Sequence, residues 1–209
     1  MTGYQLTKEW FQPVKQNVWR QLLPKLAPTK ILEIGSFEGA SACFLIDFLS
    51  ANSEIELHCV DTWEGSIEQR APESGIDMSA VEARFKSNIA LACENAVHKP
   101  QLVIHKQRSD DCLAQMVAEG KKNYFDLIYV DGSHQASDVL CDAVLGFKLL
   151  RVGGLMIFDD YLWAPPPPQG RDPLRSPKPA IDAFVNLNFG KLSVLRAHLD
   201  QLYVLKIAD

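Results

Sequence analysis

The sequence predicts an α/β fold in which a mostly parallel sheet carries helices on both of its faces. Short apolar runs alternate with amphipathic segments along most of the chain, the order typical of parallel strands joined by crossover helices. Several of these runs end in glycine or aspartate. The last two runs are separated by only a few residues, which indicates an antiparallel hairpin because parallel strands need a longer crossover.

Composition narrows the class of protein. The chain has 209 residues, a formal charge of −5 and no lysine or arginine cluster longer than a pair, so a nucleic acid is disfavoured as a partner. The five cysteines form no C-x-x-C pair and are expected to be reduced, as in a cytoplasmic protein. No signal sequence or membrane-length apolar run is evident. A homo-oligomer remains an open alternative.

The N-terminal residues 1–28 are expected to form a helical extension. Residues 7–26 place apolar side chains at helical spacing, which predicts an amphipathic helix with Thr7 as its cap. The helix is expected to end near Pro24 and Pro28. The apolar positions at this spacing are Trp10, Val14, Val18 and Leu22, and Phe11, Trp19 and Leu23 lie close by. Packing across the sheet is the preferred interpretation. A subunit contact and a wall over a substrate pocket are the alternatives.

A glycine-containing corner at residues 31–41 is the strongest ligand-binding signal. A buried strand reaches Glu33, Gly35 and Gly39 follow, and an apolar helix begins near residue 42. Glycines permit a sharp turn and close approach of a ligand to the backbone, and the helix start presents free N–H groups. The spacing is E-x-G-x-x-x-G rather than the G-x-G-x-x-G of dinucleotide sites.

The next two predicted strands also end in polar residues at the same sheet edge. Residues 55–63 contain a strand that ends in Asp61; this carboxylate is expected to accept hydrogen bonds from a ribose, with a turn-stabilising role as the alternative. Residues 101–109 form the third strand, and Ser109, Asp110 and Asp111 open a helix. These three residues are candidate helix caps.

A carboxylate cluster is predicted where the fourth and fifth strands end. Residues 125–134 lead to Asp131 and His134, and residues 151–161 pass through a Gly-Gly turn to Asp159 and Asp160. Parallel strands present their carboxyl ends at one edge, where three carboxylates repel one another unless a cation compensates them. Oxygen ligands favour Mg²⁺. Helix capping and solvation are the alternative roles for these acids, and capping is also the alternative for His134.

The remaining segments are predicted in less detail. Residues 64–80 are polar and are expected to form a loop near the site, followed by a helix over 79–96. Residues 164–179 contain seven of the twelve prolines and are expected to form an extended loop beside the site. A helix over 180–187 and strands over 191–197 and 201–207 complete the chain.

Together, E-x-G-x-x-x-G, Asp131-Gly-Ser-His134 and Asp159-Asp160 resemble the class I S-adenosylmethionine-dependent methyltransferases. The similarity is to the metal-dependent O-methyltransferases, both the catechol type and the macrocin-like and cephalosporin-hydroxylase-like sugar type. It implies a Rossmann-like, doubly wound, seven-stranded sheet with a C-terminal antiparallel hairpin. The resemblance covers about residues 30–161. Because the length suits one α/β domain and no domain boundary is evident, residues 1–209 are expected to form a single methyltransferase domain.

The resemblance also implies roles for particular residues. Asp131, Asp159 and Asp160 would hold Mg²⁺, and His134 would be the general base that deprotonates a hydroxyl of a small sugar or polyhydroxylated acceptor, with Asp131 also in the catalytic set. S-adenosylmethionine would contact Glu33, Gly35, Ser36, Gly39, Ser41, Asp61, Thr62, Trp63, Ser109, Asp110 and Asp131, with Ser109 and Asp110 near the adenine. The alternatives are an NAD-linked oxidoreductase, disfavoured by the missing third glycine, and a non-catalytic nucleotide-binding protein.

Overall fold

The computed structural model describes residues 3–165 and 172–209 and contains one seven-stranded sheet. The strand order is β3-β2-β1-β4-β5-β7-β6. β1 to β5 are parallel, whereas β7 is antiparallel to both β5 and β6. The strands are β1 (Lys30–Ile34), β2 (Glu56–Val60), β3 (Gln101–His105), β4 (Phe125–Val130), β5 (Leu150–Phe158), β6 (Leu192–Leu195) and β7 (Leu202–Lys206). This arrangement confirms the predicted fold class.

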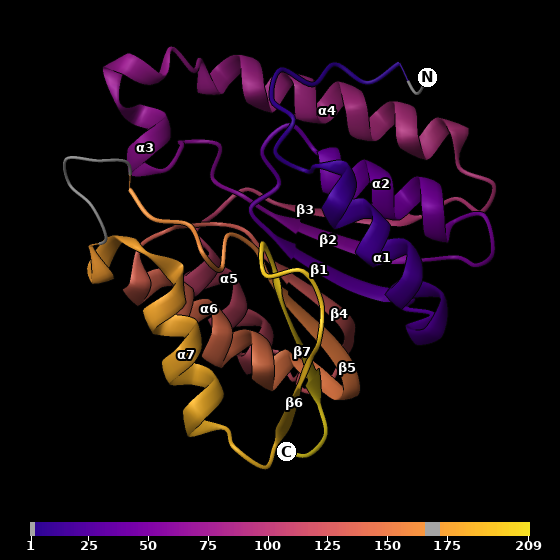
Figure 1. Ribbon diagram of the computed structural model, residues 1–209. Helices are drawn as coiled ribbons and strands as arrows, with labels where there is room; N and C mark the ends of the chain where they lie inside the picture. The colour runs from indigo at the N-terminus through magenta and orange to yellow at the C-terminus, as the bar shows by residue number, and fades with distance from the viewer. Residues whose placement is uncertain (1–2, 166–171) are drawn as a thin grey trace.

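Helices cover both faces of this sheet (Figure 1). One apolar cluster joins α1 (Pro13–Leu26), α2 (Ala40–Leu49) and α4 (Met78–Asn95) to one face. A second cluster joins α5 (Ser109–Ala118), α6 (Ala136–Leu149) and α7 (Pro177–Leu187) to the other. Because β4 contributes alternate residues to the two clusters and is buried throughout, the sheet is the middle of three layers. No helix in the described ranges is both long and apolar enough to cross a membrane.

Strand register brings the ends of four strands together. Ile34 at the end of β1 pairs with Val60 on one side and Val130 on the other, and Val130 pairs with Phe158. Each following residue continues the ladder: the N–H of Gly35 donates to Val60, that of Asp131 to Ile34 and that of Asp159 to Val130, at 2.8–2.9 Å. The predicted convergence of strand-end residues at one sheet edge is therefore confirmed.

The N-terminal helix differs from the prediction in where it begins and in which face it packs against the sheet. α1 starts at Pro13, whereas residues 3–12 contain no helix and Thr7 is not its cap. Thr7 instead donates from its N–H and its hydroxyl to the buried Glu38, at 2.6 and 2.7 Å. The buried residues of α1 are Lys15, Trp19 and Leu23, one position along the helix from the predicted apolar face.

Two predicted loops contain short helices. Residues 64–80 include α3 (Ile67–Arg70) and a 3₁₀ turn, η1 (Pro72–Ser74). Ser66 caps α3 through a capping box with Gln69, a signal that the loop prediction overlooked. In the proline-rich segment, η2 spans Pro173–Arg175 and α7 starts at Pro177 rather than residue 180, since proline suits the first helical turn. Residues 166–171 of the predicted extended segment lie outside the described residues.

The Gly-Gly pair before the fifth strand is not a turn outside the strand. Gly153 and Gly154 lie within β5, where the pairing with β4 shifts register between Phe125 and Leu127. Gly153 has φ of 80°, and a Cβ on Gly154 would lie 2.7 Å from the Leu150 side chain. The pair therefore accommodates an irregularity in the strand.

Candidate active site

A cavity of about 1000 Å³ opens at the carboxyl edge of the sheet. It extends from the glycine corner after β1 to the acids after β4 and β5, and the α3 region and the N-terminal segment also line it. The N-terminal segment and α1 contribute six residues to the cavity lining: Leu6, Lys8, Trp10, Phe11, Gln12 and Lys15. The N-terminal region is therefore part of the cavity wall, which was the minority interpretation of the sequence.

The glycine corner brings two strand ends into direct contact. Gly35 has φ of 83°, and a Cβ there would lie 2.1 Å from the Asp131 carbonyl oxygen and 2.7 Å from the Gly132 Cα. Gly39 also has a left-handed φ, 85°, at the N-cap of α2. No side chain fits at Gly35 without separating the two strand ends.

Backbone strain in non-glycine residues also gathers around the cavity. Phe37, Trp63 and Asp160 have φ values of 47°, 51° and 53°, a region that costs free energy for residues with a side chain. Trp63 is buried, packs on Phe85 and donates from its indole N–H to the Phe37 carbonyl at 2.9 Å. Trp63 thus holds the loop in place from outside the cavity lining.

Glu33 lies beneath the corner and stabilises its loop. It is fully buried and accepts hydrogen bonds of 2.5 Å from the hydroxyls of Ser36 and Ser41. Burial raises the pKa of Glu33 to about 7, and the two serine hydrogen bonds oppose this rise. Glu33 has no surface in the cavity, so the structure gives it a positioning place rather than direct contact with a ligand.

Asp61 lines the cavity but already has hydrogen-bond donors. One oxygen accepts from the backbone N–H groups of Ser36 and Phe37, both at 2.9 Å, and the other accepts from the N–H of Trp63 at 2.7 Å. The carboxylate therefore links the end of β2 to the glycine corner. Its remaining lone pairs are available to a ligand in the cavity.

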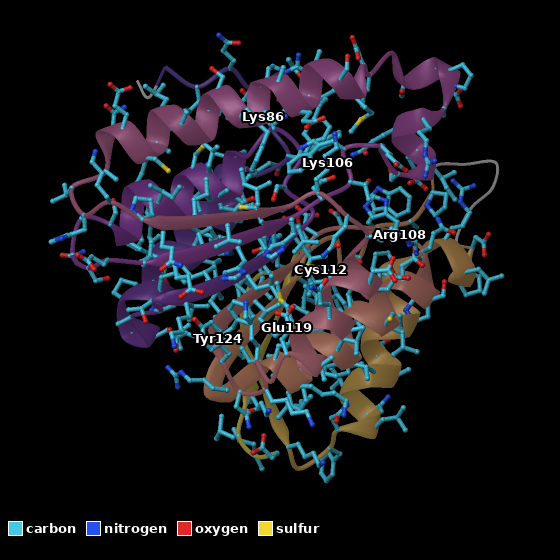
Figure 2. The ribbon with its side chains drawn as sticks, turned by 180° about the vertical axis from the view of Figure 1, so that it is seen from behind. Lys86, Lys106, Arg108, Cys112, Glu119 and Tyr124 are labelled. Atoms are coloured by element: carbon cyan, nitrogen blue, oxygen red, sulfur yellow. The ribbon has the colours of Figure 1, made fainter. Side chains whose placement is uncertain are left out.

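The third junction differs from its predicted capping role. Arg108 is the N-cap of α5, Ser109 is its first residue, and no side-chain cap is present. Asp110 lies outside the cavity lining and forms a two-pronged pair with Arg108, at 3.0 and 2.9 Å; Figure 2 labels this arginine at the back of the molecule. Ser109 lines the cavity and is the better placed of the two for a ligand.

Asp131, Asp159 and Asp160, hereafter the carboxylate trio, do come together. Each offers an oxygen within 4.8 Å of the others. One oxygen of each acid has a protein partner: Tyr129 donates toward Asp131 and Asp159 at 2.9 and 2.8 Å, and Asp160 pairs with His134. The other oxygen of Asp159 is buried without a hydrogen-bond partner among the described residues.

A lysine that the sequence did not single out lies against this trio. The Lys15 ammonium is 2.6 Å from Asp159 Oδ2, and both side chains are buried. Burial lowers the pKa of Lys15, but the charges of Asp159 and Asp131 outweigh that effect and raise it. Asp131 has exposed surface, but desolvation of its carboxylate in the cavity and repulsion by Asp159 and Asp160 raise its pKa. The lysine thus compensates part of the charge that the trio accumulates.

His134 occupies a cage at the edge of the trio. Its Nε2 lies 3.0 Å from Asp160 Oδ2, its ring stacks on Trp163 with centroids 3.8 Å apart, and its Nδ1 lies 3.8 Å from Glu68 Oε2. Burial raises the pKa of Asp160, but the hydrogen bond from His134 and the charge of Lys15 outweigh burial and lower it. A histidine held by a carboxylate can accept a proton on its other nitrogen.

Most of the residues predicted to bind a ligand do share the cavity. The lining includes Gly35, Ser36, Ser41, Asp61, Thr62, Ser109, Asp131, His134, Asp159 and Asp160. Glu33, Gly39, Trp63 and Asp110 are not part of that lining. The first three support the loops around it, and Asp110 lies at the protein surface.

Comparison with known proteins agrees with this arrangement. A family described as "Methyltransferase domain" matches residues 32–161, from the first strand through the acid pair. The chain belongs to this methyltransferase family. A curated relative, "Uncharacterized protein R132" of Acanthamoeba polyphaga mimivirus, is 24% identical over 137 residues, which cover 64% of this chain and 53% of that protein. The match thus spans about half the length of the curated relative.

Solved structures share the methyltransferase's fold at low sequence identity. An O-methyltransferase from Bacillus cereus in complex with SAH has a TM-score of 0.62 and 19% identity, covering 98% of this chain and 84% of that one. The O-methyltransferase TomG from Streptomyces achromogenes, involved in tomaymycin synthesis and in complex with SAM, has a TM-score of 0.62 and 18% identity, with coverages of 93% and 80%.

Three residues of the methyltransferase's site were missed in the sequence. Lys15 lies four residues before the fully buried Trp19 on the same helical stripe, so a lysine at an apolar helix position was an available signal. Tyr129, two residues before Asp131, shares its side of β4 and is fully buried. Glu68 had no comparable signal, because the α3 region was interpreted as an unstructured loop.

The buried Glu33 predicts a pH-dependent stability for this methyltransferase. Its pKa rises from 4.5 to about 7 on folding, so the protonated carboxyl stabilises the fold below pH 4.5, and this contribution is lost as the pH rises through about 7. A shift of this size in the pKa of Glu33 corresponds to about 3 kcal/mol of unfolding free energy. Urea unfolding should therefore show Glu33→Gln gaining up to about 3 kcal/mol on the wild type between pH 4.5 and 7.5. An unfolding free-energy difference that is constant with pH would contradict the assignment.

Proposed function

We propose that this methyltransferase transfers a methyl group from S-adenosylmethionine to a hydroxyl oxygen of a small sugar or polyhydroxylated molecule, assisted by Mg²⁺. The observation that carries the proposal is that the carboxylate trio and His134 line the same cavity as the glycine corner. The family assignment disfavours the NAD-linked alternative. The named O-methyltransferases with bound SAH or SAM share the fold and support the choice of methyl donor.

The cavity suits a nucleoside ligand beside a small acceptor. Its volume of about 1000 Å³ is at the upper end of the range of small-molecule sites. Ser36, Asp61 and Ser109 supply hydroxyl and carboxylate groups at the corner, where α/β proteins bind nucleotides. When bound, S-adenosylmethionine supplies an activated methyl group on a sulfonium. The corner residues would orient this donor toward the trio.

The trio suits a hard divalent cation. Its donors are all carboxylate oxygens within 4.8 Å of one another, the type of ligand that Mg²⁺ prefers. The buried Asp159 Oδ1 has no partner among the described residues, and such an atom is costly to leave unpaired. When bound, Mg²⁺ lowers the pKa of a coordinated hydroxyl and fixes its direction. Asp131, Asp159 and Asp160 would hold it.

His134 is the proposed acceptor of the hydroxyl proton. If Nε2 donates to Asp160, then Nδ1 carries the lone pair. Nδ1 is buried without a hydrogen-bond partner among the described residues, so the groups that cover it must move when the acceptor binds. A proton taken on Nδ1 would lie beside the Glu68 carboxylate, 3.8 Å away. Stacking on Trp163 keeps the ring in place. With the donor bound, methyl transfer to the oxygen would break the carbon–sulfur bond of the sulfonium, and His134 would hold the proton released from the hydroxyl.

Calorimetric titration of the metal-stripped protein tests the proposal. S-adenosylmethionine and S-adenosylhomocysteine should bind with micromolar dissociation constants, with and without Mg²⁺, whereas NAD should give no heat. A separate titration with Mg²⁺ should give a signal that Asp160→Ala abolishes, because one of three oxygen ligands is lost. The matched control is Asp110→Ala, an acid in the surface pair with Arg108.

The outcomes separate the alternatives. If NAD binds and neither S-adenosylmethionine nor S-adenosylhomocysteine does, an oxidoreductase would replace the proposal. If none of the three ligands binds, a non-catalytic protein is indicated. Screening hydroxylated acceptors for S-adenosylhomocysteine release then identifies the acceptor class. A Mg²⁺ signal that survives in Asp160→Ala would contradict the metal site while leaving methyl transfer intact.

A further inference from the structure

The carboxylate trio is contacted by a positively charged side chain from a distant part of the chain. Lys15 lies on α1, 144 residues before Asp159, and its ammonium reaches the acid at 2.6 Å. Its residue exposure is 7%. A buried ammonium is expensive to desolvate unless charges around it compensate, and the residues after β4 and β5 supply those charges.

The helix that carries Lys15 is fastened on both sides of it. Trp19, one helical turn further on, is fully buried, donates to Gln201 Oε1 at 2.8 Å and meets the Tyr129 ring edge-on at 4.9 Å. Before the helix, Thr7 donates twice to Glu38. These contacts fix α1 against the sheet, so the ammonium is placed at the trio by the fold and not by a flexible surface chain.

Among the described residues, each acid of the trio has a protein partner on one oxygen only. Lys15 and Tyr129 contact Asp159 Oδ2, Tyr129 also contacts Asp131 Oδ2, and His134 contacts Asp160 Oδ2. Asp159 Oδ1 remains buried without a partner within the described part of the chain. The protein therefore compensates part of the charge of the trio, and Asp159 Oδ1 is a carboxylate oxygen that a second cation would use.

We propose that Lys15 is the resident counter-ion of the carboxylate trio. Without a divalent cation it stabilises the three acids, and by repulsion it weakens their affinity for that cation. Lys15 is thus a positioning residue that acts through Asp159. This inference rests on the proposed function in one respect, namely that the trio binds a divalent cation. It needs neither the methyl donor nor the acceptor for its test.

Binding of Mn²⁺ to the metal-stripped protein, followed by the electron paramagnetic resonance of free Mn²⁺, measures the repulsion. Lys15→Met should lower the Mn²⁺ dissociation constant by about tenfold or more, since the positive charge 2.6 Å from one carboxylate of the trio is removed. Lys15→Arg keeps the charge and should stay within about twofold of the wild type. Lys25→Met removes an exposed lysine from the same helix and should also match the wild type.

Thermal unfolding separates a counter-ion from a residue that merely packs. In EDTA, Lys15→Met should melt several degrees below the wild type, and saturating Mn²⁺ should remove most of that difference, because a cation then replaces the missing charge. Loss of packing alone would lower the melting temperature equally in both conditions. If Lys15→Met does not accumulate as folded protein, Lys15→Gln is judged by the same two measurements.

Two results would overturn the inference: an unchanged or weaker Mn²⁺ affinity in the neutral variant, or a loss of melting temperature that Mn²⁺ does not relieve. Absence of Mn²⁺ binding in the wild type and in both neutral variants would also overturn it. Failure of the proposed methyl transfer would be seen in a different measurement, the calorimetric titration, in which S-adenosylhomocysteine would not bind to the wild type. The two failures are therefore distinguishable.

Discussion

Replacing His134 by alanine should lower kcat for methyl transfer by about 10²–10⁴-fold, the usual contribution of a positioned general base. The imidazole is held by Asp160 at 3.0 Å and by stacking on Trp163, so alanine removes the proton acceptor without unpacking a strand. The dissociation constant of S-adenosylmethionine should change by less than about threefold, because the corner residues that we propose as the donor site are untouched. Steady-state release of S-adenosylhomocysteine with the best acceptor from a panel of catechols and sugars measures kcat.

The matched control is His98→Ala, which removes an exposed histidine from the connection between α4 and β3. It should leave kcat at the wild-type value. If His134→Ala retains most of its kcat at neutral pH, the hydroxyl loses its proton by another route, and His134 only supports Asp160. A parallel loss of kcat and of donor binding would instead indicate a damaged corner.

The fold could be predicted because alternating apolar runs and short connections leave few topologies. The meeting of Gly35, Asp131 and Asp159 followed from the same reasoning, since parallel strands that end together place their next residues at one edge, as the register shows. The trio was therefore predictable from strand ends alone. Its partners were not, because they come from elements whose placement depends on side-chain packing.

Lys15 shows where sequence reasoning stopped. The N-terminal helix was predicted with Trp10, Val14, Val18 and Leu22 as its apolar face and with Trp19 and Leu23 only close by. In the structure it is Trp19 and Leu23 that share the buried stripe with the lysine. A helix face that contains a lysine is less apolar than the adjacent face and is therefore not predicted to be buried. Burial beside acids nevertheless makes that lysine favourable. For Glu33, predicted as a ligand contact, pattern alone could not distinguish a cavity-facing carboxylate from one bonded to Ser36 and Ser41.

Replacing Gly35 by alanine should be among the most damaging single changes in the protein. A Cβ at this position would lie 2.1 Å from the Asp131 carbonyl oxygen, and φ is 83°. Left-handed backbone costs about 1–2 kcal/mol for a residue with a Cβ, and forcing atoms into a packed site adds about 1–3 kcal/mol. Urea unfolding should therefore show a loss of about 4 kcal/mol. Folded protein that remains should bind S-adenosylmethionine poorly, because Asp131 must move away from the corner.

Gly120→Ala provides the control that separates the two costs. Gly120 has nearly the same φ, 87°, but no atom of the described residues lies within 4 Å of the position that its Cβ would take. This variant should therefore lose only the left-handed backbone cost of about 1–2 kcal/mol. Both substitutions reduce the entropy of the unfolded chain equally, and that effect cancels in the comparison. The excess loss in Gly35→Ala thus measures the close approach of β1 and β4. Equal losses in the two variants would mean that the corner can open, and that Gly35 is required for its φ and not for contact with Asp131.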